Sequence, residues 1–199
     1  GYELRIRVFS SGQLLSGWPE GFSAGVRRRL VRLGVELYEH VRVTKLVDGV
    51  LHLDMGDAYR YDLALLAIGI RPPSLFRDSG LPTGPSGGLA VGPFLEAETV
   101  PGLFGAGDCI DFMPQPLEKV GVYAVRQAKT LVYNLRAAAE GRKLRRFKPG
   151  PSYLFALNLG YPEGLARKFG IIWGGSSAWK IKHHFDTAFA ARFKAYTET

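Results

Sequence analysis

The stretch Thr99-Val-Pro-Gly-Leu-Phe-Gly-Ala-Gly-Asp-Cys109 decides how the rest of the chain is interpreted. Pro101-Gly102 predicts a turn, and Leu103-Phe104 begins a short buried strand. The next residues, Gly105-Ala-Gly107, are too small to fill a core, so we expect another group to approach this backbone closely. Asp108 then ends the strand with a carboxylate, which accepts hydrogen bonds from ligand hydroxyls. The stretch predicts a site for a polyhydroxylated ligand; the alternative is a tight turn with Asp108 as a helix cap.

Composition limits the class of protein. The chain has 199 residues, enough for one large domain or two small ones, and its hydrophobic fraction of 46% is typical of soluble globular proteins. No apolar run is as long as a membrane span, and the first residues do not resemble a signal peptide. Cys109 is the single cysteine, which excludes an internal disulfide and a CxxC pair. We therefore expect a cytoplasmic protein.

The net charge of +8 is concentrated near the C-terminus. Residues 1–140 contain 15 Lys and Arg against 15 Asp and Glu, whereas residues 141–199 contain 11 against 3. A local excess of positive charge indicates a local partner or surface.

The first forty residues predict a strand, a helix and a second parallel strand. The strands are residues 4–9 and 35–38. The helix begins at Pro19 and is ended by Gly34. Arg27-Arg28-Arg29 on this helix is either a phosphate site or, as we favour, a solvated face.

Two further β patterns follow. Residues 41–47 and 50–53 flank Asp48-Gly49, a strong hairpin signal. After a second turn, Leu63-Ala-Leu-Leu-Ala67 has no polar alternation and predicts a strand buried on both faces. Ile68-Gly69 ends that strand.

The second half of the chain begins with a predicted loop over residues 74–88 and a short strand over 89–91. A long helix is expected from about Glu118 to Glu140. Strands are predicted over residues 153–157 and 166–172, and Ser176 or Ser177 is expected to cap a last helix. Its apolar stripe consists of Ile181, Phe185, Phe189 and Phe193.

Three segments resemble known proteins. Phe104-Gly-Ala-Gly-Asp108 resembles the second flavin-binding motif of the pyridine nucleotide-disulphide oxidoreductase superfamily, in which the Asp holds the ribityl chain of FAD. Ala67-Ile-Gly-Ile-Arg-Pro72 resembles the family's ATGxxP element, with Ile68 in place of Thr. The region after residue 147 resembles the C-terminal part of type II NADH dehydrogenases, which mediates dimer or membrane contact.

The resemblance implies an α/β fold in three parts. Residues 1–74 are similar to the C-terminal part of a Rossmann-like NAD(P)-binding domain with an antiparallel meander. Residues 75–147 are similar to the C-terminal part of an FAD-binding domain. Residues 148–199 form a small α+β region. Because no GxGxxG turn is present, we expect a fragment whose partner is the missing N-terminal part of the same protein.

The resemblance also implies cofactor-binding residues. Gly107 and Asp108 are expected at FAD, and the backbone of Val120-Gly121-Val122 is expected to face the flavin ring. The expected nicotinamide-side residues are Ala67, Gly69 and Ser10. Ser10 or Ser11 stands where NAD-preferring relatives carry an acid, so the choice between NADH and NADPH stays open. No catalytic acid or base and no metal are expected.

We therefore expect part of a flavoprotein oxidoreductase that passes hydride from NAD(P)H to FAD and electrons to an acceptor, with quinone as a candidate. The alternative is a non-catalytic module of the same fold that acts through protein or membrane contacts. A homodimer and a peripheral position at the inner face of a membrane are the other expectations. Nucleic-acid binding is not expected, because no recognised motif accompanies the basic residues.

Overall fold

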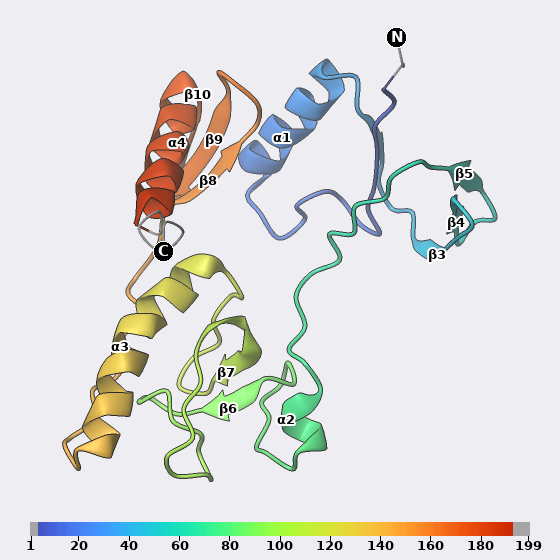
Figure 1. Ribbon diagram of the computed structural model, residues 1–199. Helices are drawn as coiled ribbons and strands as arrows, with labels where there is room; N and C mark the ends of the chain where they lie inside the picture. Colours follow the sequence, from blue (N-terminus) through green and yellow to red (C-terminus); the bar gives the residue numbers. More distant parts are fainter. Residues whose placement is uncertain (1–3, 193–199) are drawn as a thin grey trace. The chain divides into compact units, whose positions relative to one another are not determined.

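Residues 4–192 are described by a computed structural model, in which the chain forms two compact units (Figure 1). Unit 1 combines Gly1–Leu65 with Ser152–Thr199, and unit 2 is Leu66–Pro151. Both units mix helices with small open sheets, which confirms the predicted α/β class. The predicted three-part division stays a prediction.

The predicted strand–helix–strand unit is confirmed in unit 1. β1 (Arg7–Phe9) pairs in parallel with β2 (Glu36–Tyr38), and α1 (Glu20–Arg32) lies between them in sequence. Pro19 is the N-cap of α1. Gly34 follows the helix with a φ of +73°, a conformation that glycine adopts without steric cost.

The predicted hairpin is also confirmed, and a third strand extends it. β3 (Val43–Val47), β4 (Val50–Leu53) and β5 (Ala58–Arg60) form an antiparallel sheet. Asp48 and Gly49 both have positive φ, +49° and +72°, as a two-residue turn with the twist of the adjoining strands requires.

The prediction of a buried strand over Leu63–Ala67 is wrong. The segment forms no regular structure, and Leu63 and Leu65 are 78% and 86% exposed. A strand buried on both faces needs paired neighbours and covering layers. No strand in residues 4–192 pairs with this segment, and the β1–β2 sheet has only two strands.

Unit 1 also contains an antiparallel sheet followed by a helix: β8 (Phe155–Asn158), β9 (Gly164–Lys168), β10 (Ile171–Gly175) and α4 (Ser176–Ala191). The single strand predicted over 166–172 is wrong, because Phe169 and Gly170 adopt positive φ and turn the chain between β9 and β10. The predicted serine cap is also wrong. Gly175, with a φ of +86°, is the N-cap, and no side chain caps the helix.

The apolar stripe of α4 is only partly packed. Ile181 is half-buried, whereas Phe185 and Phe189 are 58% and 46% exposed. Phe193 lies outside the described residues. The β8–β9–β10 sheet therefore covers the beginning of the stripe and leaves Phe185 and Phe189 accessible.

The helix α1 packs against the C-terminal sheet (Figure 1). Phe22 is fully buried and lies in one apolar cluster with Val26 and Leu165 of β9. The ring of Trp18 lies 4.1 Å from that of Phe155 on β8. These contacts join residues near the two ends of the chain into one core.

Two arginines of α1 form ion pairs at the edge of this core. Glu163, in the loop before β9, lies 3.4 Å from Arg29 and 3.0 Å from Arg32. Arg29 also donates to the carbonyl of Leu159 at 2.9 Å. Arg29 is therefore part of a contact between α1 and the C-terminal sheet, which neither sequence-based alternative included.

Unit 2 contains two helices, a 3₁₀ turn and two strands: α2 (Leu75–Asp78), β6 (Leu89–Val91), η1 (Gly107–Cys109), β7 (Ile110–Phe112) and α3 (Gly121–Ala139). The predicted strand over 89–91 and the long helix are confirmed, while the predicted loop over 74–88 contains the short α2. β6 and β7 pair in parallel. The core of this unit is Leu89, Val91, Leu95, Ala97, Ile110, Phe112 and Phe147.

Candidate functional site

A pocket of about 280 Å³ lies in unit 2 between η1, the loop before α3 and the first turns of α3. Two of the predicted site residues, Gly107 and Asp108, line it. The other lining residues that matter for its chemistry are Ser86, Asp111, Lys119, Tyr123 and Gln127. The pocket is therefore built around the motif that the sequence singled out.

The motif itself folds differently from the prediction. Residues 103–106 do not form a strand; only Phe104 makes a β-bridge, to Glu96. A Cβ on Gly105 would lie 2.7 Å from Ile110 Cγ2 and 3.0 Å from Leu89 Cδ2. Gly105 is therefore small because β6 and β7 pack against it, and the expectation of a ligand at this backbone position is corrected.

Gly107 connects the motif to α3. Its φ is +84°, which favours glycine, and its N–H donates to Oε1 of Gln127 at 2.5 Å. Gln127 is only 2% exposed. A buried polar side chain with a backbone partner fixes the position of the turn, because leaving either group unpaired would be costly. The residue immediately before Asp108 is thus held by the helix.

Asp108 is one of the residues that line the pocket. The residue is half-buried, and within residues 4–192 its side chain makes no hydrogen bond or ion pair. It is therefore available to a ligand, and its assignment to the ribityl chain of FAD stays a prediction. Cys109, the next residue, is half-buried and its Sγ lies 3.3 Å from the carbonyl oxygen of Ala106.

The backbone of Val120, Gly121 and Val122 forms the start of α3. Val120 is the N-cap, with no side-chain cap on the helix. The first N–H groups of a helix lack intrahelical acceptors, and the helix dipole adds positive potential there. The pocket is lined by residues on both sides of this turn, Lys119 and Tyr123. The start of the helix therefore lies beside the pocket, but Val120, Gly121 and Val122 do not line it themselves, and their contact with a flavin stays a prediction.

Asp111 is a charged residue that the sequence analysis missed. Its carboxylate accepts hydrogen bonds from the Ser86 hydroxyl at 2.6 Å, the Ser86 N–H at 2.9 Å and the Gly88 N–H at 3.2 Å. Lys119 Nζ lies 3.5 Å away and donates to the Ile110 carbonyl at 2.8 Å. Burial alone would raise the pKa of Asp111, but the hydrogen bonds and Lys119 outweigh it, so the pKa lies below its ordinary value.

The predicted nicotinamide-side residues are not part of this pocket. Ser10 lies in unit 1 just after β1; its N–H donates to the Tyr38 carbonyl and its carbonyl accepts from the Val41 N–H. Ala67 and Gly69 are exposed in the irregular stretch that begins unit 2, where Gly69 has a φ of +91°. Their assignment to a nucleotide stays a prediction.

Glu36, on β2, has ordered polar partners within unit 1. Glu36 accepts hydrogen bonds from Arg7 Nε at 2.8 Å and from the Tyr38 hydroxyl at 3.0 Å. The Arg7 hydrogen bond holds the pKa of Glu36 below its ordinary value, and the bond to Glu36 raises the pKa of Tyr38. The aromatic ring of Tyr38 stacks on Phe9 with centroids 4.9 Å apart. Glu36 is therefore ionised and already paired.

Comparison with known families gives one clear match. The family model described as pyridine nucleotide-disulphide oxidoreductase matches residues 7–130. A curated relative, the NADH dehydrogenase-like protein YutJ of Bacillus subtilis (strain 168), is 26% identical over 148 residues, which cover 74% of this chain and 41% of YutJ. The residues matched by the family model, 7–130, include β1 to β7 and the first half of α3.

Solved structures support the same fold. The crystal structure of reduced Bacillus anthracis CoADR-RHD matches with a TM-score of 0.64 at 20% identity, covering 82% of this chain and 30% of that one. An FAD-dependent pyridine nucleotide-disulphide oxidoreductase from Desulfovibrio vulgaris gives a TM-score of 0.64 at 22% identity, covering 80% and 41%. The chain thus spans less than half the length of these relatives.

Proposed function

Because the chain belongs to the pyridine nucleotide-disulphide oxidoreductase family, we propose that the complete gene product is an FAD-dependent enzyme that takes hydride from NAD(P)H and passes electrons to an acceptor. The observation that carries the proposal is Asp108, which lines the pocket beside the start of α3 and whose side chain makes no hydrogen bond or ion pair within residues 4–192. The absence of a GxGxxG turn from the 199 residues means that this chain does not itself carry the pyrophosphate site of the family.

The residues of the pocket fit part of FAD. When bound, FAD supplies the redox chemistry, and the protein positions it and adjusts its electrostatics. The Asp108 carboxylate accepts hydrogen bonds from hydroxyls such as those of a ribityl chain. The N–H groups at Gly121 and Val122 favour negative charge on a ligand group at the N-terminal end of the helix. The pocket of about 280 Å³ accommodates a portion of FAD only.

Two charged residues keep the pocket in shape. Asp111 fixes the Ser86–Gly88 turn through three hydrogen bonds, and Lys119 joins Asp111 to the β7 backbone. Because Asp111 is ionised and fully engaged by these donors, it serves as a structural anion. Asp108 remains the acceptor for the ligand.

The test uses the complete gene product. Purified protein is expected to show a flavin absorption band, to release FAD on denaturation, and to be reduced by NADH or NADPH under anaerobic conditions. Measuring both nucleotides decides the preference that Ser10 leaves open. A complete gene product that neither carries FAD nor regains it on incubation with FAD contradicts the proposal.

For the acceptor we propose quinone. The support is the similarity to a protein named NADH dehydrogenase-like. Gln127, on α3, is buried and bonded to the Gly107 N–H, so it is not proposed as a quinone contact. Oxidation of NADH with a soluble quinone, compared with oxygen alone, tests the acceptor. No acceleration by quinone refutes this part and leaves the flavin proposal intact.

A further inference from the structure

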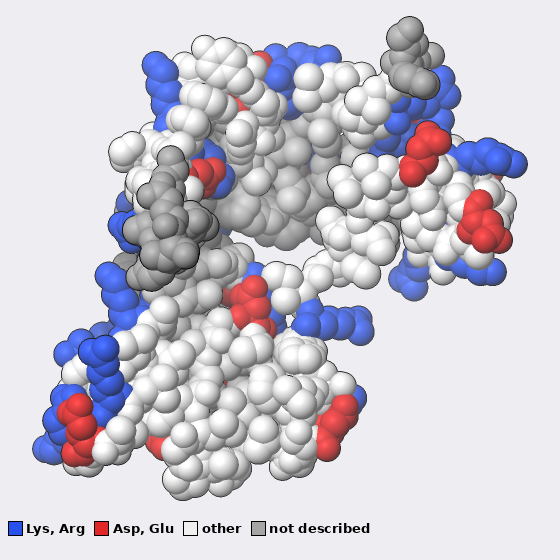
Figure 2. Space-filling view, in the orientation of Figure 1, with Lys and Arg blue, Asp and Glu red and all other residues white. Residues whose placement is uncertain are grey.

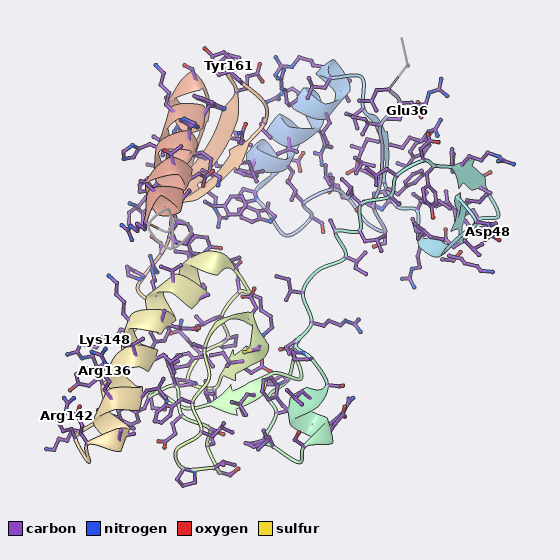
Figure 3. The ribbon with its side chains drawn as sticks, in the orientation of Figure 1. Glu36, Asp48, Arg136, Arg142, Lys148 and Tyr161 are labelled. Atoms are coloured by element: carbon purple, nitrogen blue, oxygen red, sulfur yellow. The ribbon has the colours of Figure 1, made fainter. Side chains whose placement is uncertain are left out.

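The turn between β3 and β4 brings together two groups that can react with each other. Asp48-Gly49 is the only Asp-Gly pair in the 199-residue sequence, and its aspartate is exposed. Figure 3 labels Asp48 at the turn of this hairpin, and Figure 2 shows acidic and basic side chains exposed over the β3–β4–β5 sheet. Water therefore has access to the turn, as a reaction that releases or consumes water requires.

Both of these groups are free of other partners. Within residues 4–192 the Asp48 carboxylate makes no hydrogen bond or ion pair, and the Gly49 N–H donates to no acceptor. The reason is the geometry of a two-residue turn, because the ladder pairs Val47 with Val50 and leaves the two residues between them outside it. Gly49 also has no Cβ that would hinder an approach to its nitrogen.

A second aspartate shows what is particular to this turn. Asp78, the last residue of α2, is also exposed and is followed by the small Ser79. The Ser79 N–H donates to the Leu75 carbonyl at 2.9 Å, and the Asp78 carboxylate lies 3.5 Å from Arg77 Nε. Exposure and a small next residue are therefore common to both aspartates, whereas the unengaged carboxylate and amide nitrogen distinguish Asp48.

We propose that Asp48 converts spontaneously to isoaspartate through a cyclic imide. The Gly49 nitrogen attacks Cγ of the protonated Asp48 carboxyl group; the N–Cγ bond forms, the Cγ–OH bond breaks, and the hydroxyl leaves with the amide proton as water. Water then opens the imide ring at either carbonyl carbon. Opening at Cγ restores aspartate, whereas opening at the main-chain carbonyl carbon leaves the chain linked through Cβ and Cγ. No oxidant or cofactor takes part, so the inference is independent of the flavin proposal.

Isoaspartate at this position lengthens the hairpin turn. It adds a carbon atom to the main chain between Val47 and Val50, and the length of a turn fixes the register of its strands. β4 is the central strand of this sheet, and its Leu51 and Leu53 are 9% and 6% exposed. A one-residue slip would turn both leucines to the other face of the sheet. We therefore expect the turn to open and the adjoining β3–β4 hydrogen bonds to weaken.

The test is ageing of the folded 199-residue chain at neutral pH. Trypsin releases residues 46–60 as one peptide, which also contains Asp54 and Asp57. Both are exposed and precede a residue with a side chain, so they are internal controls. The peptides are methylated with protein-isoaspartate methyltransferase and labelled S-adenosylmethionine. We expect the label to increase with time at Asp48 and to stay at its starting level at the other aspartates.

Two variants of Asp48 test the chemistry. Asp48→Glu keeps the charge but needs a larger ring, which forms more slowly, so we expect the label to be lost. Asp48→Asn forms the same imide with loss of ammonia, and its amide is not deactivated by ionisation, so we expect more label than in the unmodified chain. Asparagine also tolerates positive φ, which preserves the turn. Circular dichroism and tryptophan fluorescence confirm that each variant is folded.

The consequence for the hairpin is measured on the isoaspartate form after chromatographic separation. We expect faster hydrogen exchange of the backbone amides of β3 and β4 than in the unmodified chain. The amides of α3, which belongs to unit 2, are the reference and are expected to exchange at an unchanged rate.

Each of four results overturns the proposal. The first is the absence of label at Asp48 in the folded chain; a synthetic peptide of residues 46–60 that is labelled under the same conditions then shows that the folded turn prevents ring closure. The second is equal label at Asp54 or Asp57, which leaves exposure alone as the cause. The third is label at position 48 of Asp48→Glu. The fourth is unchanged exchange of β3 and β4 in the isoaspartate form, which refutes the opening of the turn.

Discussion

Replacing Gln127 by methionine tests the link between α3 and the flavin motif. Methionine is similar in size and as good a helix former, so the change removes the acceptor of the Gly107 N–H and leaves the packing nearly intact. An unsatisfied N–H costs about 1–3 kcal/mol. Because Gly107 is only half-buried and water can reach it from the pocket, we expect the lower part of this range, about 1–2 kcal/mol. This corresponds to a rise of about 5- to 30-fold in the fraction of molecules in which unit 2 is open to hydrogen exchange.

Hydrogen exchange of backbone amides in β6, β7 and α3 measures this effect within unit 2. The chain supplies an internal reference, because Trp18, Trp173 and Trp179 all lie in unit 1, and their fluorescence reports on that unit during urea unfolding. Gln115→Met is the matched control, since Gln115 is exposed in the loop before α3 and should change stability by less than about 0.5 kcal/mol. Exchange rates in Gln127→Met that equal those in Gln115→Met refute the proposed link. If the urea transition followed by tryptophan fluorescence shifts by the same free energy as the exchange in unit 2, the effect of Gln127→Met is not restricted to unit 2.

Three further predictions concern the same site. In the complete gene product, Asp108→Ala is expected to weaken FAD binding by about 1.5–3 kcal/mol through lost hydrogen bonds to an ionised acceptor; unchanged flavin content after dialysis would return Asp108 to a turn-forming role. Since the folded pKa of Asp111 lies below its ordinary value, its stabilising contribution is present above about pH 4 and lost as pH falls through the folded pKa. Asp111→Asn should therefore destabilise unit 2 at neutral pH and flatten its acid unfolding curve, and an unaltered curve contradicts this. The isolated 199-residue chain is expected to hold no FAD, because it has no GxGxxG turn for the pyrophosphate; a yellow protein after desalting disproves it.

The parts of the fold that local chemistry decides were predictable from the sequence. Asp48-Gly49 prefers the positive φ values that a tight hairpin needs, and Gly34 ends α1 for a similar reason. The α1 pattern and the short β6 strand were equally visible. In each of these cases the residues that determine the structure are close together in sequence.

The sequence-based predictions were wrong where the local structure depends on residues distant in sequence, or on a neighbouring strand that the sheet does not contain. The apolar run Leu63–Ala67 has strand composition, but no strand of the described chain pairs with it. Between β9 and β10, Phe169 takes a positive φ that an aromatic residue rarely adopts, so composition gave no sign of the turn. Gly105 was attributed to a ligand, whereas Ile110 and Leu89 fill the space beside it.

The residues of the pocket also divide into those that a local motif indicates and those whose roles depend on residues distant in sequence. The place of Asp108 at the pocket could be anticipated because it ends a short recognisable motif, while its role toward FAD stays a prediction. Gln127 and Asp111 could not, since a glutamine within a helix and an aspartate within a strand are usually solvated. Their roles depend on Gly107 and Ser86, which lie 20 and 25 residues away in sequence.

The discontinuity of unit 1 has a consequence for the order in which the chain folds during translation. All of unit 2 is synthesised before residues 152–175, a delay of several seconds at about 5–20 residues per second. During that time α1 has no sheet to cover Phe22 and Val26, and Arg29 has no Glu163 to pair with. Unit 2, whose contacts are contiguous in sequence, can complete its core first. The nascent N-terminal segment therefore stays uncovered for longer than any part of unit 2, and a ribosome stalled before β8 has made the whole of unit 2 but only the first part of unit 1.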